Sequence, residues 1–253
     1  IEEETFCNCS SLAQILLPDS IKSIKAGAFS GCSSLKEFSI PDSVTAIDNY
    51  VFCNCSSLKE IKILSNIRSI GEGAFKNCSS LSQVTIPLSV TLINNSAFSM
   101  CTSLTKITFN DSVFSIGCDC FSGCTSLEEI NLPCILKKIE TNTFYQCKSL
   151  KTIAIPSSVY IIETNAFKEC SSLQNVLFSE DSSLKIIDYD AFMYCTSLNN
   201  IILPHHIDFI NKNVFYGCDS LTKYSFPKRF ENDLELMGIG KGKSQNNSKC
   251  NIY

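Results

Sequence analysis

The fold is decided by the stretch Leu35-Lys-Glu-Phe-Ser-Ile-Pro-Asp-Ser-Val-Thr-Ala-Ile-Asp-Asn-Tyr-Val-Phe-Cys-Asn-Cys55. Its pattern returns along most of the chain. The phrase Phe-x-x-Cys-x-Ser-Leu occurs ten times, and its phenylalanines are Phe6, Phe29, Phe52, Phe75, Phe98, Phe121, Phe144, Phe167, Phe192 and Phe215. They lie 23 residues apart, except for a 25-residue step from Phe167 to Phe192. A fixed period of this length predicts a solenoid, in which each coil buries its apolar face only against its neighbours.

Each unit predicts one β-strand and one short turn segment. A run such as Leu150-Lys-Thr-Ile-Ala-Ile155 alternates apolar and polar residues, which is typical of a strand. All seven prolines close such runs, where the missing N–H costs no sheet hydrogen bond: Pro18, Pro41, Pro87, Pro133, Pro156, Pro204 and Pro227. An isoleucine stands five residues before each Phe, and the segment between them can hold at most one turn of 3₁₀ or α-helix.

Stacking these units predicts an α/β solenoid. We expect a curved, right-handed coil with a parallel β-sheet on its concave face and short 3₁₀ or α turns on its convex face. A serine stands five residues after every Phe, from Ser11 to Ser220. We expect its hydroxyl to bond backbone groups that the corner of the coil would otherwise leave unpaired.

The pattern Leu-x-x-Ile-x-Ile-Pro-x-x-Val-x-x-Ile-x-x-x-Ala-Phe-x-x-Cys resembles the 23-residue leucine-rich repeat of the BspA-like surface proteins. The resemblance covers residues 1–227. In three units the proline is replaced, by Leu64, Asn110 and Ser179. The two-residue insertion lies in Ser-Glu-Asp-Ser-Ser183, and we expect this segment to form one longer corner loop. The resemblance implies a surface adhesin or antigen that binds host, matrix or microbial surfaces.

The chain is predicted to have one repeat domain, residues 1–227, and a C-terminal tail, residues 228–253, that is partly disordered. Phe230, Leu234, Leu236, Met237 and Ile239 are candidates for a partial cap over the last coil, whereas Gly-Lys-Gly-Lys-Ser-Gln-Asn-Asn-Ser248 has the composition of a disordered segment. The chain opens at Ile1 in the middle of a coil, so we expect a longer protein.

Ten of the sixteen cysteines occupy the repeat position three after Phe: Cys9, Cys32, Cys55, Cys78, Cys101, Cys124, Cys147, Cys170, Cys195 and Cys218. We interpret them as buried thiols, because disulfides could join only alternate neighbours and would make nearly identical coils unequal. The other six are Cys7, Cys53, Cys118, Cys120, Cys134 and Cys250, and their Cys-x-Cys spacing is not typical of zinc sites. We therefore predict no metal and no cofactor. Unpaired thiols favour a reducing or oxygen-poor setting.

Composition and motifs argue against catalysis and against nucleic acid. The only histidines, His205 and His206, are predicted to be exposed at a corner, with no cysteine visible beside them for a nucleophilic pair. The net charge is −4, and without the tail it is −6, with 16 basic against 22 acidic side chains. Phosphate binding needs a concentrated basic surface. No run of roughly 18 apolar residues is present for a membrane span.

The residues two and four after each leucine are predicted to face outward on the sheet, since the residues between them face the core. From these two columns we take the following candidate ligand-binding residues: Glu37, Glu60, Lys62, Thr85, Lys106, Thr108, Glu129, Asn131, Thr152, Ala154, Asn175, Leu177, Asn200 and Ile202. The charges near the start, joined by Lys36 and Lys59, form either a solvated face or part of a site. Ala154, Leu177 and Ile202 form an outward apolar strip that favours a partner.

Two functions fit this sequence. The first is a non-enzymatic interaction module at the cell surface or outside the cell, which binds proteins or glycans along the concave sheet. The adhesive role in it is implied by the resemblance. The second is an intracellular leucine-rich repeat scaffold or regulator, which the many thiols favour.

Overall fold

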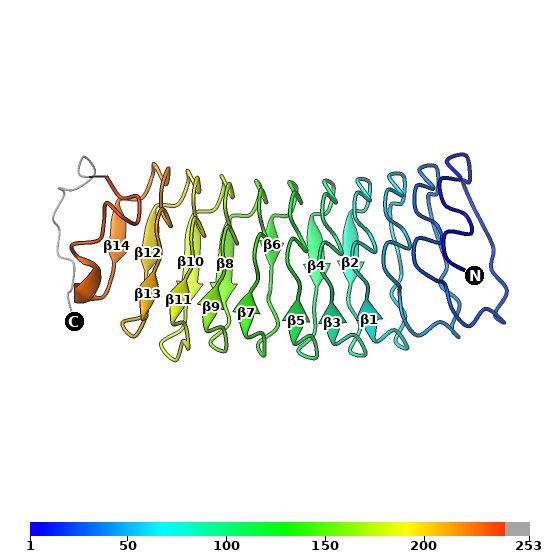
Figure 1. Cartoon of the computed structure of the whole chain (residues 1–253), viewed down its shortest axis with the longest axis horizontal. Coiled ribbons are helices and arrows are strands. Elements are labelled where there is room, and N and C mark those ends of the chain that lie inside the picture. The colour runs from blue at the N-terminus through cyan, green and yellow to red at the C-terminus, as the bar shows by residue number, and fades with distance from the viewer. Residues whose placement is uncertain (241–253) are drawn as a thin grey trace.

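A computed structural model describes residues 1–240, and within this range the coils stack into an elongated solenoid with the first and the last coil at opposite ends of the stack (Figure 1). All strand pairs are parallel and join neighbouring coils, as predicted. The disorder predicted for Gly240–Ser248 falls almost entirely on residues 241–253, which lie outside the described residues.

The predicted strands form the first of two rows along the stack, which we call the first wall. The alternating pattern of the sequence produces it, because every second side chain turns into the core. In register, Leu177 lies beside Ala154 and Val176 beside Ile153. Its strands are β2 (Gln83–Thr85), β4 (Lys106–Thr108), β6 (Glu129–Ile130), β8 (Thr152–Ile155), β10 (Asn175–Phe178), β12 (Asn200–Ile202) and β14 (Lys223–Ser225).

A second row of strands, the second wall, was not predicted. In each coil the residue three after the proline position donates its backbone N–H to the carbonyl at that position, as Val159 does to Pro156 at 3.0 Å, and this turn reverses the chain. The following isoleucine then points into the same core, and two residues pair with the next coil. These strands are β1 (Ser69–Ile70), β3 (Leu92–Ile93), β5 (Ser115–Ile116), β7 (Lys138–Ile139), β9 (Ile161–Ile162), β11 (Ile186–Ile187) and β13 (Phe209–Ile210). Two residues are too few to show an alternation in the sequence.

The segment around each Phe makes the hydrogen bonds of a 3₁₀ turn without forming a helix. Cys32 N donates to Phe29 O at 3.2 Å and Ser30 N to Gly27 O at 2.9 Å. The residues two before and two after every Phe have positive φ, and this left-handed backbone stops each turn from continuing. In the described chain the one helical element is η1 (Lys228–Phe230), a 3₁₀ turn.

The core is a ladder of equivalent side chains. Consecutive repeat phenylalanines stack face to face, with ring centroids 5.1 to 6.0 Å apart. Each repeat cysteine after Cys9 donates its thiol to the carbonyl of the Phe in the preceding coil, as Cys78 does to Phe52 O at 3.1 Å. The prediction of buried repeat thiols is confirmed for these nine, whereas Cys9 is exposed in the first coil.

The expectation for the corner serines was wrong by one residue. In the described chain, no hydroxyl of the serine five after Phe makes the predicted bond. In six coils the hydroxyl of the Ser or Thr before it does, at 3.2 to 3.4 Å, as Ser56 Oγ donates to Ser33 O at 3.4 Å. The backbone N–H of the predicted serine instead points along the stack, and Ser57 N donates to the same Ser33 carbonyl at 3.2 Å. One carbonyl therefore accepts two bonds at this corner.

The insertion forms one longer corner, as predicted. Ser182 N donates to Ser179 O at 3.1 Å, and the following strand β11 returns to register with β9, Ile187 beside Ile162. At the C-terminal end, Phe215 N donates to Met237 O at 2.8 Å, so the backbone ladder between coils extends to this residue. Of the five candidate cap residues, Phe230, Met237 and Ile239 are buried, Leu234 is half-buried and Leu236 is exposed.

Candidate binding face

The first wall carries all fourteen candidate residues on its outer side. Twelve of them are exposed, and Asn175 and Asn200 are half-buried. The outward direction predicted from the alternation is therefore confirmed, while their binding of a ligand stays a prediction. Two parts of this face differ from the rest, one at each end of the stack.

The apolar strip lies on β8, β10 and β12 near the C-terminal end. Leu177 is paired with Ala154, and its side chain is 53% exposed. Ile202 belongs to the next coil and is 62% exposed. Neighbouring coils are about 4.8 Å apart, so the three side chains form a continuous apolar surface. Asn175 and Asn200 lie beside each other along one edge of it.

The charged cluster near the N-terminal end lines a shallow groove of about 380 Å³ over the first three coils. Glu37, Glu60 and Lys62 border this groove, whereas Lys36 and Lys59 do not line it. Gln14 donates its side-chain N–H to Glu37 Oε1 at 3.4 Å. The remaining lining residues are Ile15, Leu16, Phe38, Ser39 and Ile61, and Leu16 is 84% exposed.

The second wall has an apolar patch of its own that sequence reasoning missed. Phe209 is 64% exposed, and it is in register with the half-buried Ile186, which pairs with Ile161. The signal was present, because the residue before each repeat isoleucine must face outward if that isoleucine is a strand residue facing the core. No second strand was expected, so this column of outward residues was not predicted.

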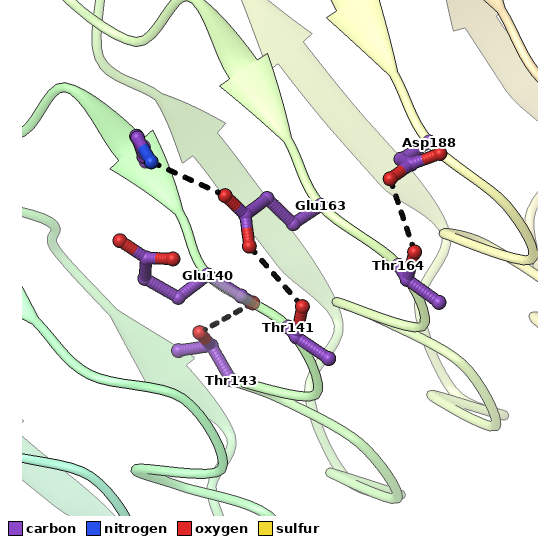
Figure 2. A network of polar contacts seen from close by, with 7 residues as sticks. Glu140, Thr141, Thr143, Glu163, Thr164 and Asp188 are labelled. Atoms are coloured by element: carbon purple, nitrogen blue, oxygen red, sulfur yellow. Dashed lines mark hydrogen bonds and ion pairs between the residues drawn. The ribbon is translucent and has the colours of Figure 1, made fainter.

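A ladder of carboxylates follows the second wall, with its hydroxyl and ammonium partners shown in Figure 2. Glu163 accepts hydrogen bonds from Thr141 Oγ1 at 3.1 Å and from Lys138 Nζ at 3.4 Å. Thr164 Oγ1 donates to Asp188 Oδ2 at 3.0 Å. Burial first, and then the hydrogen bond and charge of Glu163, raise the pKa of the Glu140 carboxyl. This network stabilises the stack of coils. Because both carboxylate oxygens of Glu163 already accept a hydrogen bond, little hydrogen-bonding capacity is left on Glu163 for another group.

The buried repeat cysteines are unreactive thiols, and the two histidines lie at one corner. Burial raises the pKa of the Cys55 thiol to about 12, and a protonated thiol is a poor nucleophile. His205 is exposed and His206 half-buried, with ring centroids 6.4 Å apart at the predicted corner. Among residues 1–240, no group of three or more His, Cys, Asp and Glu side chains is placed to hold a metal ion. Cys250 lies outside the described residues.

Parallel strands, stacked 23-residue coils and a ladder of core leucines define a solenoid of the leucine-rich repeat class. Six copies of the BspA type leucine-rich repeat region match the chain, over residues 1–105, 91–222 and 178–234. The chain therefore belongs to the BspA-type leucine-rich repeat family.

Solved structures of similar proteins agree with this assignment. A leucine-rich repeat protein from Bacteroides ovatus is 30% identical with a TM-score of 0.59, covering 90% of this chain and 76% of that chain. A leucine rich cell surface protein from Faecalibacterium prausnitzii is 27% identical with a TM-score of 0.57, covering 95% and 79%. The pneumococcal vaccine antigen PcpA, at 21% identity, a TM-score of 0.53 and coverage of 83% and 61%, shows likeness of fold alone. No curated protein matches the chain.

Proposed function

We propose that the chain is a non-enzymatic binding module of a cell-surface protein, which recognises a protein or glycan with the outer side of its first wall. The family and the similarity to a leucine rich cell surface protein from Faecalibacterium prausnitzii support the location. No helix in residues 1–240 is long and apolar enough to cross a membrane.

The observation that carries the proposal is the contrast between the two sides of the first wall. The inward Phe, Cys and Leu positions repeat in every coil, whereas the outward columns change from charged near the N-terminal end to apolar at Ala154, Leu177 and Ile202. An exposed apolar centre with a polar border is the usual composition of a protein interface. Coil stacking alone does not require such side chains at these outward positions.

Paired substitution tests the apolar centre. The variant Leu177→Asp with Ile202→Asp should lose binding to a partner captured by the unmodified protein, while the fold persists because both side chains point outward. Leu88→Asp is the matched control, since Leu88 is 75% exposed and lies outside the first-wall columns. Equal binding by the paired variant and the control would refute the role of the strip.

A second candidate, an intracellular scaffold or regulator, is favoured by the free thiols. Cys9 and Cys134 are exposed and unpaired, and such thiols persist best in reducing compartments. Biotinylation of intact cells with a reagent that cannot cross membranes separates the two candidates. Recovery of the labelled chain supports the surface module, and labelling only after lysis supports the intracellular one.

A further inference from the structure

The groove over the first three coils contains a core side chain that is larger than its counterparts. Phe38 occupies an inward position that holds isoleucine in the two neighbouring coils, at Ile15 and Ile61. Its ring lies edge-on against both Phe29 and Phe52, with centroids 4.9 and 4.7 Å away. Phe29 and Phe52 are 6.0 Å apart, the widest step in the stack of repeat phenylalanines. The Phe38 ring therefore packs against the repeat phenylalanine of its own coil and that of the next coil.

Backbone pairing is sparse in this part of the first wall. Between the first three coils, the described backbone hydrogen bonds of the wall are Lys36 N to Ala13 O at 3.4 Å and Lys59 N to Lys36 O at 3.2 Å. Assigned strands of this wall begin only at Gln83. The middle of the groove thus presents polar backbone groups beside the floor residues Ile15, Phe38 and Ile61.

The charges that border the groove have a fixed spacing. Glu60 and Lys62 are two residues apart on one face, so their backbone positions are separated by about 6.6 Å along the strand direction. Neither takes part in an ion pair within residues 1–240. Glu37 lies one coil from Glu60 and in the same column, which doubles the negative charge at that end. The groove therefore presents carboxylates at one end and an ammonium at the other.

We propose that this groove binds an extended peptide segment of a partner protein in which a basic and an acidic side chain are separated by one residue. This proposal rests on the function proposed above and names the partner chemistry for one end of the same face. Alternate side chains of an extended peptide lie on one side with the same spacing of about 6.6 Å, so the basic one meets Glu37 and Glu60 while the acidic one meets Lys62.

Other features of the groove favour a peptide over a sugar. Leu16 offers an exposed aliphatic surface at the end of the second column, which suits an apolar side chain of the peptide. The aromatic ring of the groove, Phe38, is only 7% exposed and is packed edge-on between two other rings, so it offers no open face for stacking on a sugar. A simple cation is disfavoured by Lys62 at the border.

Charge reversal tests the proposal directly. The probes are three fluorescein-labelled nonapeptides of Ser and Thr with a central Lys-Val-Glu, Lys-Val-Lys or Glu-Val-Glu. The unmodified protein should bind the Lys-Val-Glu peptide about tenfold more tightly than the other two. Glu60→Lys should shift the preference to Glu-Val-Glu, and Lys62→Glu should shift it to Lys-Val-Lys. The double variant Glu60→Lys with Lys62→Glu should regain binding of Lys-Val-Glu, because the peptide can lie in the reverse direction.

The control is Glu180→Lys, which reverses an exposed carboxylate at the inserted corner, outside the groove and outside the two candidate columns. It should leave the preference for Lys-Val-Glu unchanged, and thermal unfolding should show all variants equally folded. No discrimination among the three peptides by the unmodified protein, or an equal shift by Glu180→Lys, would overturn the proposal. If peptide selectivity fails while Leu177→Asp with Ile202→Asp still abolishes partner binding, the groove proposal falls and the proposed function stands.

Discussion

At the scale of single residues, the fold depends on twenty backbone positions with positive φ, two in each unit. Thirteen of them hold Gly, Asn or Asp, the residues that tolerate this conformation best, and the others include Tyr50, Met100 and Tyr194. Where one coil holds a large side chain, the next often holds glycine. Met100 lies over Gly123, and Tyr194 lies over Gly217. Glycine thus suits these positions for two reasons. It adopts a positive φ easily, and it leaves room for the large side chain of the neighbouring coil.

Gly123→Ala is expected to destabilise the protein. The backbone φ of +74° disfavours any side chain, and an added Cβ would lie 2.3 Å from Met100 Sδ. Adopting this φ alone costs about 1–2 kcal/mol for an alanine, and displacing the methionine adds to that. Chemical denaturation measures the loss. The control Gly240→Ala meets nothing within 4 Å, and an equal loss in both variants would contradict this account.

Asp111→Asn is expected to make Cys134 more reactive. The hydrogen bond and the charge of Asp111 raise the pKa of this exposed thiol, so less thiolate is present at pH 8. Removing the charge lowers the pKa and raises the thiolate fraction, and the labelling rate should increase severalfold. Mass-spectrometric peptide mapping after brief treatment with iodoacetamide measures it. Labelling of exposed Cys9 in the same sample should not change; a parallel increase there would point to general loosening instead.

At the scale of elements, two strand rows and one row of turns enclose the core of every coil. Hydrogen bonds in all three rows run along the stack, as in Phe52 N to Ala74 O at 2.9 Å beside the turns. Equivalent side chains therefore lie next to each other, which favours apolar ladders and places like charges side by side. The ladder of Glu140, Glu163 and Asp188 is an example in which threonines and Lys138 offset part of the repulsion.

Glu140→Gln is expected to raise stability at neutral pH. Burial and Glu163 raise the pKa of Glu140 in the folded state above its unfolded value, so the folded state binds this proton more tightly. The contribution of the Glu140 carboxyl to the free energy of unfolding is most favourable below the pKa of the unfolded state. It falls as the pH rises through the pKa of the folded state. The variant should gain up to about 1 kcal/mol at pH 7, the size of a like-charge pair across strands, and nothing at pH 4.

Urea unfolding of both proteins at the two pH values measures this gain. Glu129→Gln is the control, because Glu129 is exposed on the first wall and forms no ion pair in the described chain. A gain of equal size in Glu140→Gln at pH 4 would show that the charge is not its cause. An equal gain in the control would show that the effect is not local to the carboxylate ladder.

At the scale of the whole molecule, the 23-residue period of the sequence predicted nearly every repeating feature of the structure. The solenoid, the parallel first wall, the buried ladders of Phe, Leu and Cys and the corner at Ser179–Ser183 follow from spacing and alternation. The second wall was missed because its strands have two residues, and the corner serine was misassigned because adjacent hydroxyls are equivalent in sequence. The outward columns were predicted, but the groove was not, since it depends on the three-dimensional packing of neighbouring coils, which spacing and alternation do not report.

The molecule should tolerate removal of one whole unit. Deleting residues 104–126 joins Ser103 to Leu127, so every ladder continues in register and both the groove and the apolar strip remain. Because each coil contacts only its neighbours, we expect a folded protein that loses the stability of one coil and its interface. The urea m-value should fall by about one tenth, in proportion to the surface buried.

A deletion of half a unit is the matched test of this argument. Removing residues 104–114 joins Ser103 to Ser115 and places a second-wall segment where the first wall must continue. The Phe, Leu and Cys ladders then break at that point, and we expect loss of cooperative unfolding by circular dichroism. If the half-unit deletion folds as well as the whole-unit deletion, stability does not depend on the register of the ladders. If neither folds, contacts beyond the neighbouring coil are needed, and the one-dimensional description of the stack is wrong.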